Sequence, residues 1–116
     1  MGAGSRAVVV QMYPDYAGTV LWCSLDVDYA ESGLEEDLVA DLRAWEAAYY
    51  AGLDDFSWRS PELERRHRAE GHALARRVAG ALGEDFVVEC GGRTFRGKGP
   101  ARTPAAAAAF GALAAG

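Results

Sequence analysis

Residues 60–83 read SPELERRHRAEGHALARRVAGALG and predict a long amphipathic helix. Ser60 suits the N-cap, Pro61 suits the first helical position, and Gly83 is a typical C-terminal stop. Between these ends, the residues that form one face of the helix recur at steps of three and four positions. Its members are Leu63, His67, Gly71, Leu74, Val78 and Leu82. A helix with such a face needs an apolar partner.

Residues 32–52, SGLEEDLVADLRAWEAAYYAG, predict that partner as a second helix. Ser32 and Glu35 fit a capping box, in which the serine hydroxyl accepts from an early helical N–H and the glutamate reaches back to the cap. Gly52 is expected to end the helix. Its apolar stripe consists of Leu34, Leu38, Leu42, Trp45 and Tyr49.

Gly71 lies inside the later helix, where a glycine costs about 1 kcal/mol relative to alanine. A glycine at such a position usually makes room for a neighbour, and we expect Trp45 to pack over it. The connector between the helices, residues 54–59 (DDFSWR), contributes two further aromatic anchors, Phe56 and Trp58.

Three segments predict β-strands. Residues 7–12 (AVVVQM) form a β-branched run, and residues 19–27 (TVLWCSLDV) are largely apolar on both faces, as in an inner strand. Residues 85–96 contain a strand, the turn pair Gly91 and Gly92, and a returning strand, which indicates a hairpin. The chain is therefore expected to be α+β, with a small antiparallel or mixed sheet of about three to four strands. Two antiparallel helices would cover one face.

The C-terminal region changes character after residue 97, with a linker-like GKGPARTP and then AAAAAFGALAAG. We expect a single α+β domain over residues 1–97 and a low-complexity, alanine-rich tail over residues 98–116. An alanine helix of this length is marginal in water. The tail is expected to be mobile, or to be a helix ordered only by contact.

Charge is divided unevenly along the chain. Residues 1–58 carry eleven acidic and two basic side chains, whereas residues 59–116 carry six acidic and ten basic ones. An uncompensated acidic surface can steer a basic partner, although a solvated helix face is the plain alternative. The candidate partner-binding residues on the first helix are Glu35, Glu36, Asp37, Asp41 and Glu46.

Aromatic side chains suggest a second candidate site where strands meet helices. A small-molecule pocket there would be formed by Tyr13, Tyr16, Trp22, Trp58 and His67. No catalytic motif accompanies these residues. His67 and His72 are five positions apart, which turns the second ring by about 140° from the first, so no helical zinc motif is formed. No metal or other cofactor is expected.

Cys23 and Cys90 are expected to be buried, reduced thiols. The few basic residues near the C-terminal hairpin, on a chain of net charge −5, disfavour nucleic acid as a partner. No apolar run is long enough to span a bilayer. Residues 1–6 are too short and too poor in basic residues for a signal segment, so we expect a cytoplasmic protein.

The helical region resembles a group of small, uncharacterised actinobacterial proteins. Its pattern is L-x3-L-V-x-D-L-x2-W-x3-Y over residues 34–49, followed by W-R-S-P-E-x4-H-x2-E-G-x2-L-A-R-x-V-A-x2-L-G over residues 58–83. A D-Y…L-W signature (Asp15, Tyr16, Leu21 and Trp22) precedes it. The resemblance covers roughly residues 8–90, and it implies the fold but no activity.

The leading hypothesis is a non-enzymatic protein-binding module that captures a basic partner through the acidic first helix. Its concrete form would be a bacterial immunity or antitoxin-like inhibitor, whose carboxylates replace the phosphates that a basic toxin expects. One alternative is a small-molecule-binding protein or minor enzyme that uses the aromatic and histidine pocket. Another is a homo-oligomeric accessory subunit whose tail docks onto a neighbouring protomer.

Overall fold

The computed structural model describes residues 7–116, so residues 1–6, which bear on the signal-segment expectation, lie outside the described residues. Its main sheet has the strand order β3-β2-β1-β6-β7. β1 pairs in parallel with β6, and the other neighbouring pairs are antiparallel. The predicted α+β fold is confirmed, and of the two predicted sheet types, antiparallel or mixed, the sheet is mixed. The strands are β1 (Val8–Met12), β2 (Leu21–Cys23), β3 (Leu25–Asp26), β6 (Phe86–Cys90) and β7 (Arg93–Arg96).

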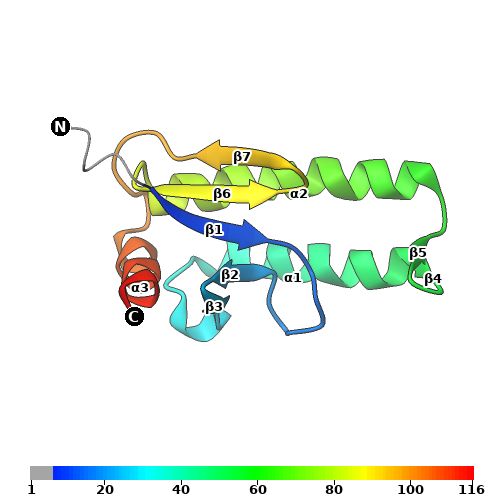
Figure 1. The fold of residues 1–116 in the computed structure, drawn as a ribbon, viewed down its shortest axis with the longest axis horizontal. Helices are drawn as coiled ribbons and strands as arrows, with labels where there is room; N and C mark the ends of the chain where they lie inside the picture. Colours follow the sequence, from blue (N-terminus) through cyan, green and yellow to red (C-terminus); the bar gives the residue numbers. More distant parts are fainter. Residues whose placement is uncertain (1–6) are drawn as a thin grey trace.

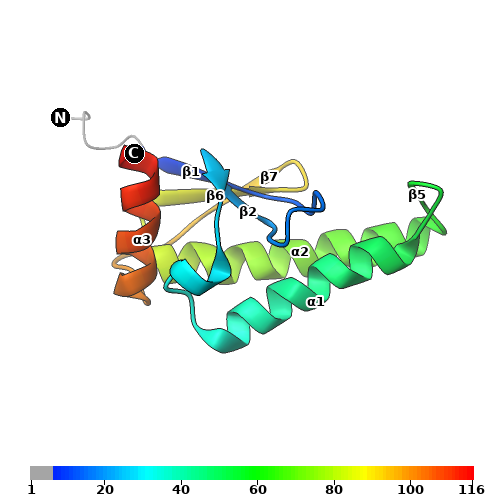
Figure 2. The same ribbon diagram turned by 90° about the horizontal axis from the view of Figure 1, so that it is seen from below.

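Two antiparallel helices, α1 (Glu36–Gly52) and α2 (Pro61–Leu82), lie on one side of this sheet (Figures 1 and 2). α2 packs against β6 and β7, and α1 packs along α2. Both helices project beyond the sheet at one end, where a two-stranded hairpin joins them (Figure 1). The hairpin consists of β4 (Leu53–Asp54) and β5 (Ser57–Trp58).

The predicted ends of α2 are confirmed. The Ser60 hydroxyl accepts a hydrogen bond from the Leu63 N–H at 3.1 Å, and Pro61 is the first helical residue. Gly83 follows the helix with a φ of 90°, a conformation that glycine adopts without strain. The predicted Gly91 and Gly92 turn joins β6 and β7, and both glycines have a positive φ.

The predicted capping box at α1 was wrong. The Ser32 hydroxyl ends a short 3-10 helix instead, donating to the Tyr29 carbonyl at 2.8 Å and accepting from the Leu34 N–H at 3.2 Å. Gly33 explains the difference. Its φ of 76° turns the chain away from a helical path. Because glycine has no Cβ, the start of the C-terminal helix can pack directly against it. Glu35 therefore precedes α1 without a side-chain cap bond.

Residues 19–27 do not form one continuous strand. Ser24 has a φ of 70°, and the chain folds back there so that Cys23 pairs with Leu25 in a tight antiparallel turn. β2 is an inner strand as expected, but β3 lies at the sheet edge and leaves Leu25 70% exposed. Because residues 19–27 form two strands, the main sheet has five strands instead of the predicted three to four.

The core lies between the sheet and the two helices, and Gly71 shows how closely they approach. A Cβ atom on Gly71 would lie 2.5 Å from Cζ2 of Trp45, which is nearer than real side chains pack. The expectation that Trp45 packs over Gly71 is confirmed. The buried residues of this core include Val10, Met12, Leu42, Trp45, Leu74, Val78, Leu82 and Val88.

The alanine-rich segment forms helix α3 (Pro104–Ala115), which crosses one end of the sheet and packs against α2 and β2 (Figure 2). Phe110 is fully buried, and its ring lies edge-on to Phe86 at a centroid distance of 6.5 Å. Of the two expectations for this segment, the structure contains the helix ordered by contact. None of the helices described in residues 7–116 is long and apolar enough to cross a membrane.

Candidate partner-binding surface and aromatic cluster

The first turns of α1 place four of the five predicted acidic residues at the surface. Glu35 precedes the helix, Glu36 and Asp37 lie in its first turn, and Asp41 follows one turn later; all four are exposed. Negative charge is stabilised at a helix N-terminus because the peptide dipoles point their positive ends there. These carboxylates are therefore compatible with the fold as well as with a basic partner.

Arg77 of α2 partly neutralises these four carboxylates, although the sequence predicts an uncompensated acidic surface. Its Nη1 lies 2.6 Å from Oδ2 of Asp41, and its Nη2 lies 4.0 Å from Oδ2 of Asp37. Within residues 7–116, Glu35 and Glu36 have no such ion pair. The packing of α2 on α1 brings Arg77 to this surface, 36 positions away from Asp41 in the sequence.

Glu46 does not belong to the exposed acidic surface. It is only 9% exposed, and its Oε2 accepts a hydrogen bond from the Tyr50 hydroxyl at 2.7 Å. The Tyr50 oxygen in turn accepts from the Tyr16 N–H at 2.7 Å. Burial and this bond to Glu46 raise the pKa of Tyr50 to about 12. Glu46 was assigned wrongly because the loop after β1 folds over this side of α1.

His67 is held against Trp45 rather than presented to a ligand. The two rings stack with centroids 4.3 Å apart and planes 7° apart. Burial lowers the pKa of the imidazole, so the ring is neutral at pH 7. Its Nε2 lies 2.8 Å from the Trp45 carbonyl oxygen, which requires Nε2 to carry the proton of the neutral ring.

The predicted aromatic pocket is formed in part. Tyr13, Trp58 and His67 line a shallow cavity of about 170 Å³. Trp22 instead stacks on Tyr13, with centroids 5.1 Å apart, and Tyr16 stacks on Tyr50 at 4.5 Å. Small-molecule sites commonly measure about 300–1,000 Å³, so this cavity is small for one.

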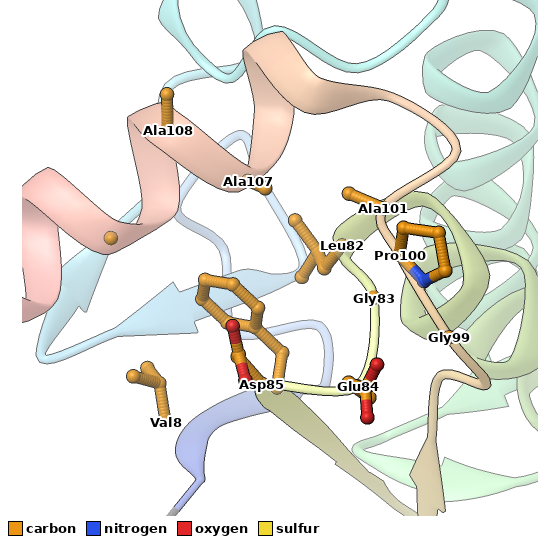
Figure 3. A pocket seen from close by; sticks show the side chains of 12 residues that line it. Val8, Leu82, Gly83, Glu84, Asp85, Gly99, Pro100, Ala101, Ala107 and Ala108 are labelled. Carbon is orange, nitrogen blue, oxygen red and sulfur yellow. The ribbon is translucent and has the colours of Figure 1, made fainter. Parts of the chain in front are cut away.

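A larger cavity of about 520 Å³ lies between the end of α2, the start of β6 and helix α3 (Figure 3). Most of its lining is small or apolar, and Glu84 and Asp85 supply its carboxylates (Figure 3). A third hollow, of about 570 Å³, lies between α2 and β7 and is lined by several basic side chains. These are Arg76, Arg77, Arg96, Lys98 and Arg102.

Neither cysteine is placed for catalysis. Both are free and buried, as expected, and burial raises the pKa of Cys23 and raises that of Cys90 to about 11. Thiols with raised pKa values carry little thiolate at pH 7 and are poor nucleophiles. In the part of the chain that the structure describes, no group of three or more His, Cys, Asp or Glu side chains is arranged to hold a metal ion.

Residues 9–90 match a family model described as Serratia CdiI immunity protein-like. The chain belongs to this family. The match runs from the second residue of β1 to the end of β6 and includes α1 and α2, whereas β7 and α3 lie outside it. No curated protein and no solved structure matches the chain. Membership of the CdiI immunity-protein-like family supports a protein-binding, inhibitory role, and nearly the same residues carry the resemblance noted in the sequence.

Proposed function

We propose that this member of the CdiI immunity-protein-like family inhibits a toxin by binding it, and that the exposed acidic residues at the start of α1 take part in the contact. The family match over residues 9–90 carries the proposal, because an immunity protein acts on another protein. The acidic surface, defined as Glu35, Glu36, Asp37 and Asp41, supplies the chemistry of the contact.

The acidic surface suits a basic patch on the toxin. Glu35 and Glu36 keep their charge available, since neither has an ion pair within residues 7–116. Asp41 is already paired with Arg77, so it offers less free charge to a partner than Glu35 and Glu36 do. Complementary charges of this kind mainly accelerate association, and salt weakens their effect.

The proposal is tested with the products of the genes that neighbour the gene for this chain, each produced alone and together with it. A cognate domain should stop growth when produced alone, and co-production should restore growth. The purified pair should form a complex whose association rate falls about tenfold or more between 50 and 500 mM NaCl. Failure of every such domain to bind the chain would contradict the proposal.

Charge reversal then tests the surface. The triple variant Glu35→Lys, Glu36→Lys and Asp37→Lys should slow association by about tenfold or more, because attraction becomes repulsion. Glu89→Lys is the control, since Glu89 is exposed on β6 and lies on another surface. Equal slowing by the control variant, or no slowing by the triple variant, would remove the acidic surface from the contact.

A further inference from the structure

We infer that Phe56, at the tip of the β4–β5 hairpin, is an anchor that inserts into an apolar socket of the toxin bordered by basic groups. This inference rests on the proposed function and adds to it a second contact of different chemistry. From the sequence, Phe56 and Trp58 are both predicted to be aromatic anchors of the connector. The structure separates the two: Trp58 is half-buried, whereas Phe56 is 82% exposed.

Exposure is the first observation. Among the described residues, Phe56 is the most exposed of the large apolar side chains. A single exposed apolar residue is common on protein surfaces and needs no explanation by itself. The backbone at Phe56 provides an independent second observation.

The backbone of the hairpin tip adopts a conformation that phenylalanine disfavours. Asp54 pairs with Ser57, so the loop has two residues, Asp55 and Phe56, with φ values of 53° and 66°. A two-residue loop with both φ values positive is normally built with glycine at the second position, because a Cβ atom is strained there. Strained residues that persist in a fold are concentrated at functional sites.

The base of the hairpin is closely packed against the end of α1, which supports the tip. A Cβ on Gly52 would lie 2.5 Å from Cζ3 of Trp58, so the indole packs directly on the end of α1. The Trp58 ring also meets Tyr49 edge-on, with centroids 5.5 Å apart. The hairpin joins the ends of α1 and α2 where they project beyond the sheet (Figures 1 and 2). Phe56 is therefore presented at the end of a preorganised arm, which reduces the entropy lost on binding.

Charge around the tip indicates the chemistry of the socket. Asp54 and Asp55 directly precede Phe56, are exposed, and have no ion pair within residues 7–116. The nearby cation, Arg59, follows β5 at the base of the hairpin. An aromatic anchor with carboxylates beside it fits an apolar pocket with a basic rim. The acidic surface likewise requires basic groups on the toxin. The two contacts would lie at opposite ends of α1, roughly 25 Å apart at 1.5 Å per residue.

The test compares thermal stability with toxin affinity in three variants. Phe56→Asn places a residue that tolerates positive φ at the tip, so its unfolding temperature should stay equal or rise by a few degrees. Its affinity for the cognate toxin domain should nevertheless fall about tenfold or more. Phe56→Tyr should keep the affinity within about threefold, because the ring is retained. Leu25→Asn, which removes an exposed apolar side chain from β3, should leave the affinity unchanged.

The outcomes separate this inference from the proposed function. If the unaltered chain binds a toxin domain and Phe56→Asn binds equally well, the anchor is wrong and the immunity function stands. A lower unfolding temperature for Phe56→Asn would show that Phe56 supports the fold and would also overturn the anchor. If the unaltered chain binds none of the domains, both proposals fail together.

Discussion

Trp45 and His67 bind each other's main chains across the α1–α2 interface. The Trp45 indole N–H donates to the His67 carbonyl at 2.8 Å, and the His67 Nε2–H donates to the Trp45 carbonyl at 2.8 Å. The rings stack between these two bonds. Each side chain therefore satisfies a main-chain carbonyl of the other helix, and the pair fixes how α1 and α2 align.

The first prediction concerns pH. Burial lowers the pKa of His67 in the folded state, so the unfolded chain binds the proton more readily. The contribution of His67 to the free energy of unfolding should be fully present above the ordinary imidazole pKa of about 6.5. It should be lost as the pH falls below that value. Urea unfolding at pH 7.5 and 5.5 measures the difference, and His67→Gln should remove the part due to this group. An identical pH dependence in His67→Gln would contradict the assignment.

The second prediction uses two glycines of the same helix. Gly71→Ala should destabilise the fold by about 1–3 kcal/mol, because the new methyl group would collide with the Trp45 ring. Gly80→Ala should stabilise it by up to about 1 kcal/mol, since the nearest atoms there are 4.0 Å away, on the Arg102 side chain. Urea unfolding of both variants measures the contrast. Equal effects of the two substitutions would mean that Trp45 does not press on Gly71.

Several features of α2 and its neighbours follow from the sequence because they depend on local chemistry. The Ser60 cap, the Gly83 stop and the Gly91–Gly92 turn each involve residues within a few positions of one another. The pairing of Trp45 with Gly71 was also predictable, since a glycine on an apolar helical face indicates a close neighbour. The candidate pocket was predicted less well, because Tyr16 and Trp22 stack on Tyr50 and Tyr13 instead of lining it.

The errors arise where a distant segment decides the local structure. The capping box at Ser32 has the right residues, but Gly33 turns the chain to admit α3, which begins 71 positions later at Pro104. Glu46 has the spacing of an exposed residue, but Tyr50 binds it under the loop after β1. Arg77 reaches the acidic surface only because α2 packs on α1. No periodicity within one helix contains this information.

The third prediction concerns Arg77. Its pair with Asp41 is partly exposed on both sides, so a double-mutant cycle of Arg77→Gln and Asp41→Asn should give a coupling of at most about 1 kcal/mol. Association with a basic toxin should instead become faster in Arg77→Gln, because a positive charge leaves the acidic surface. Stopped-flow binding at 50 mM NaCl measures the rate. Slower association of Arg77→Gln would indicate that Arg77 itself contacts the toxin.

The fourth prediction concerns α3, which lies outside the family match. Phe110→Ala should destabilise the whole fold by about 3–5 kcal/mol, because Phe110 is fully buried on α3, which packs against the sheet and α2. Leu113→Ala is the matched control in the same helix, since Leu113 is exposed, and it should cost less than about 1 kcal/mol. A single unfolding transition shifted to lower urea in Phe110→Ala would show that α3 unfolds together with the sheet. Unchanged global stability in Phe110→Ala would mean that residues 104–115 add nothing to the fold.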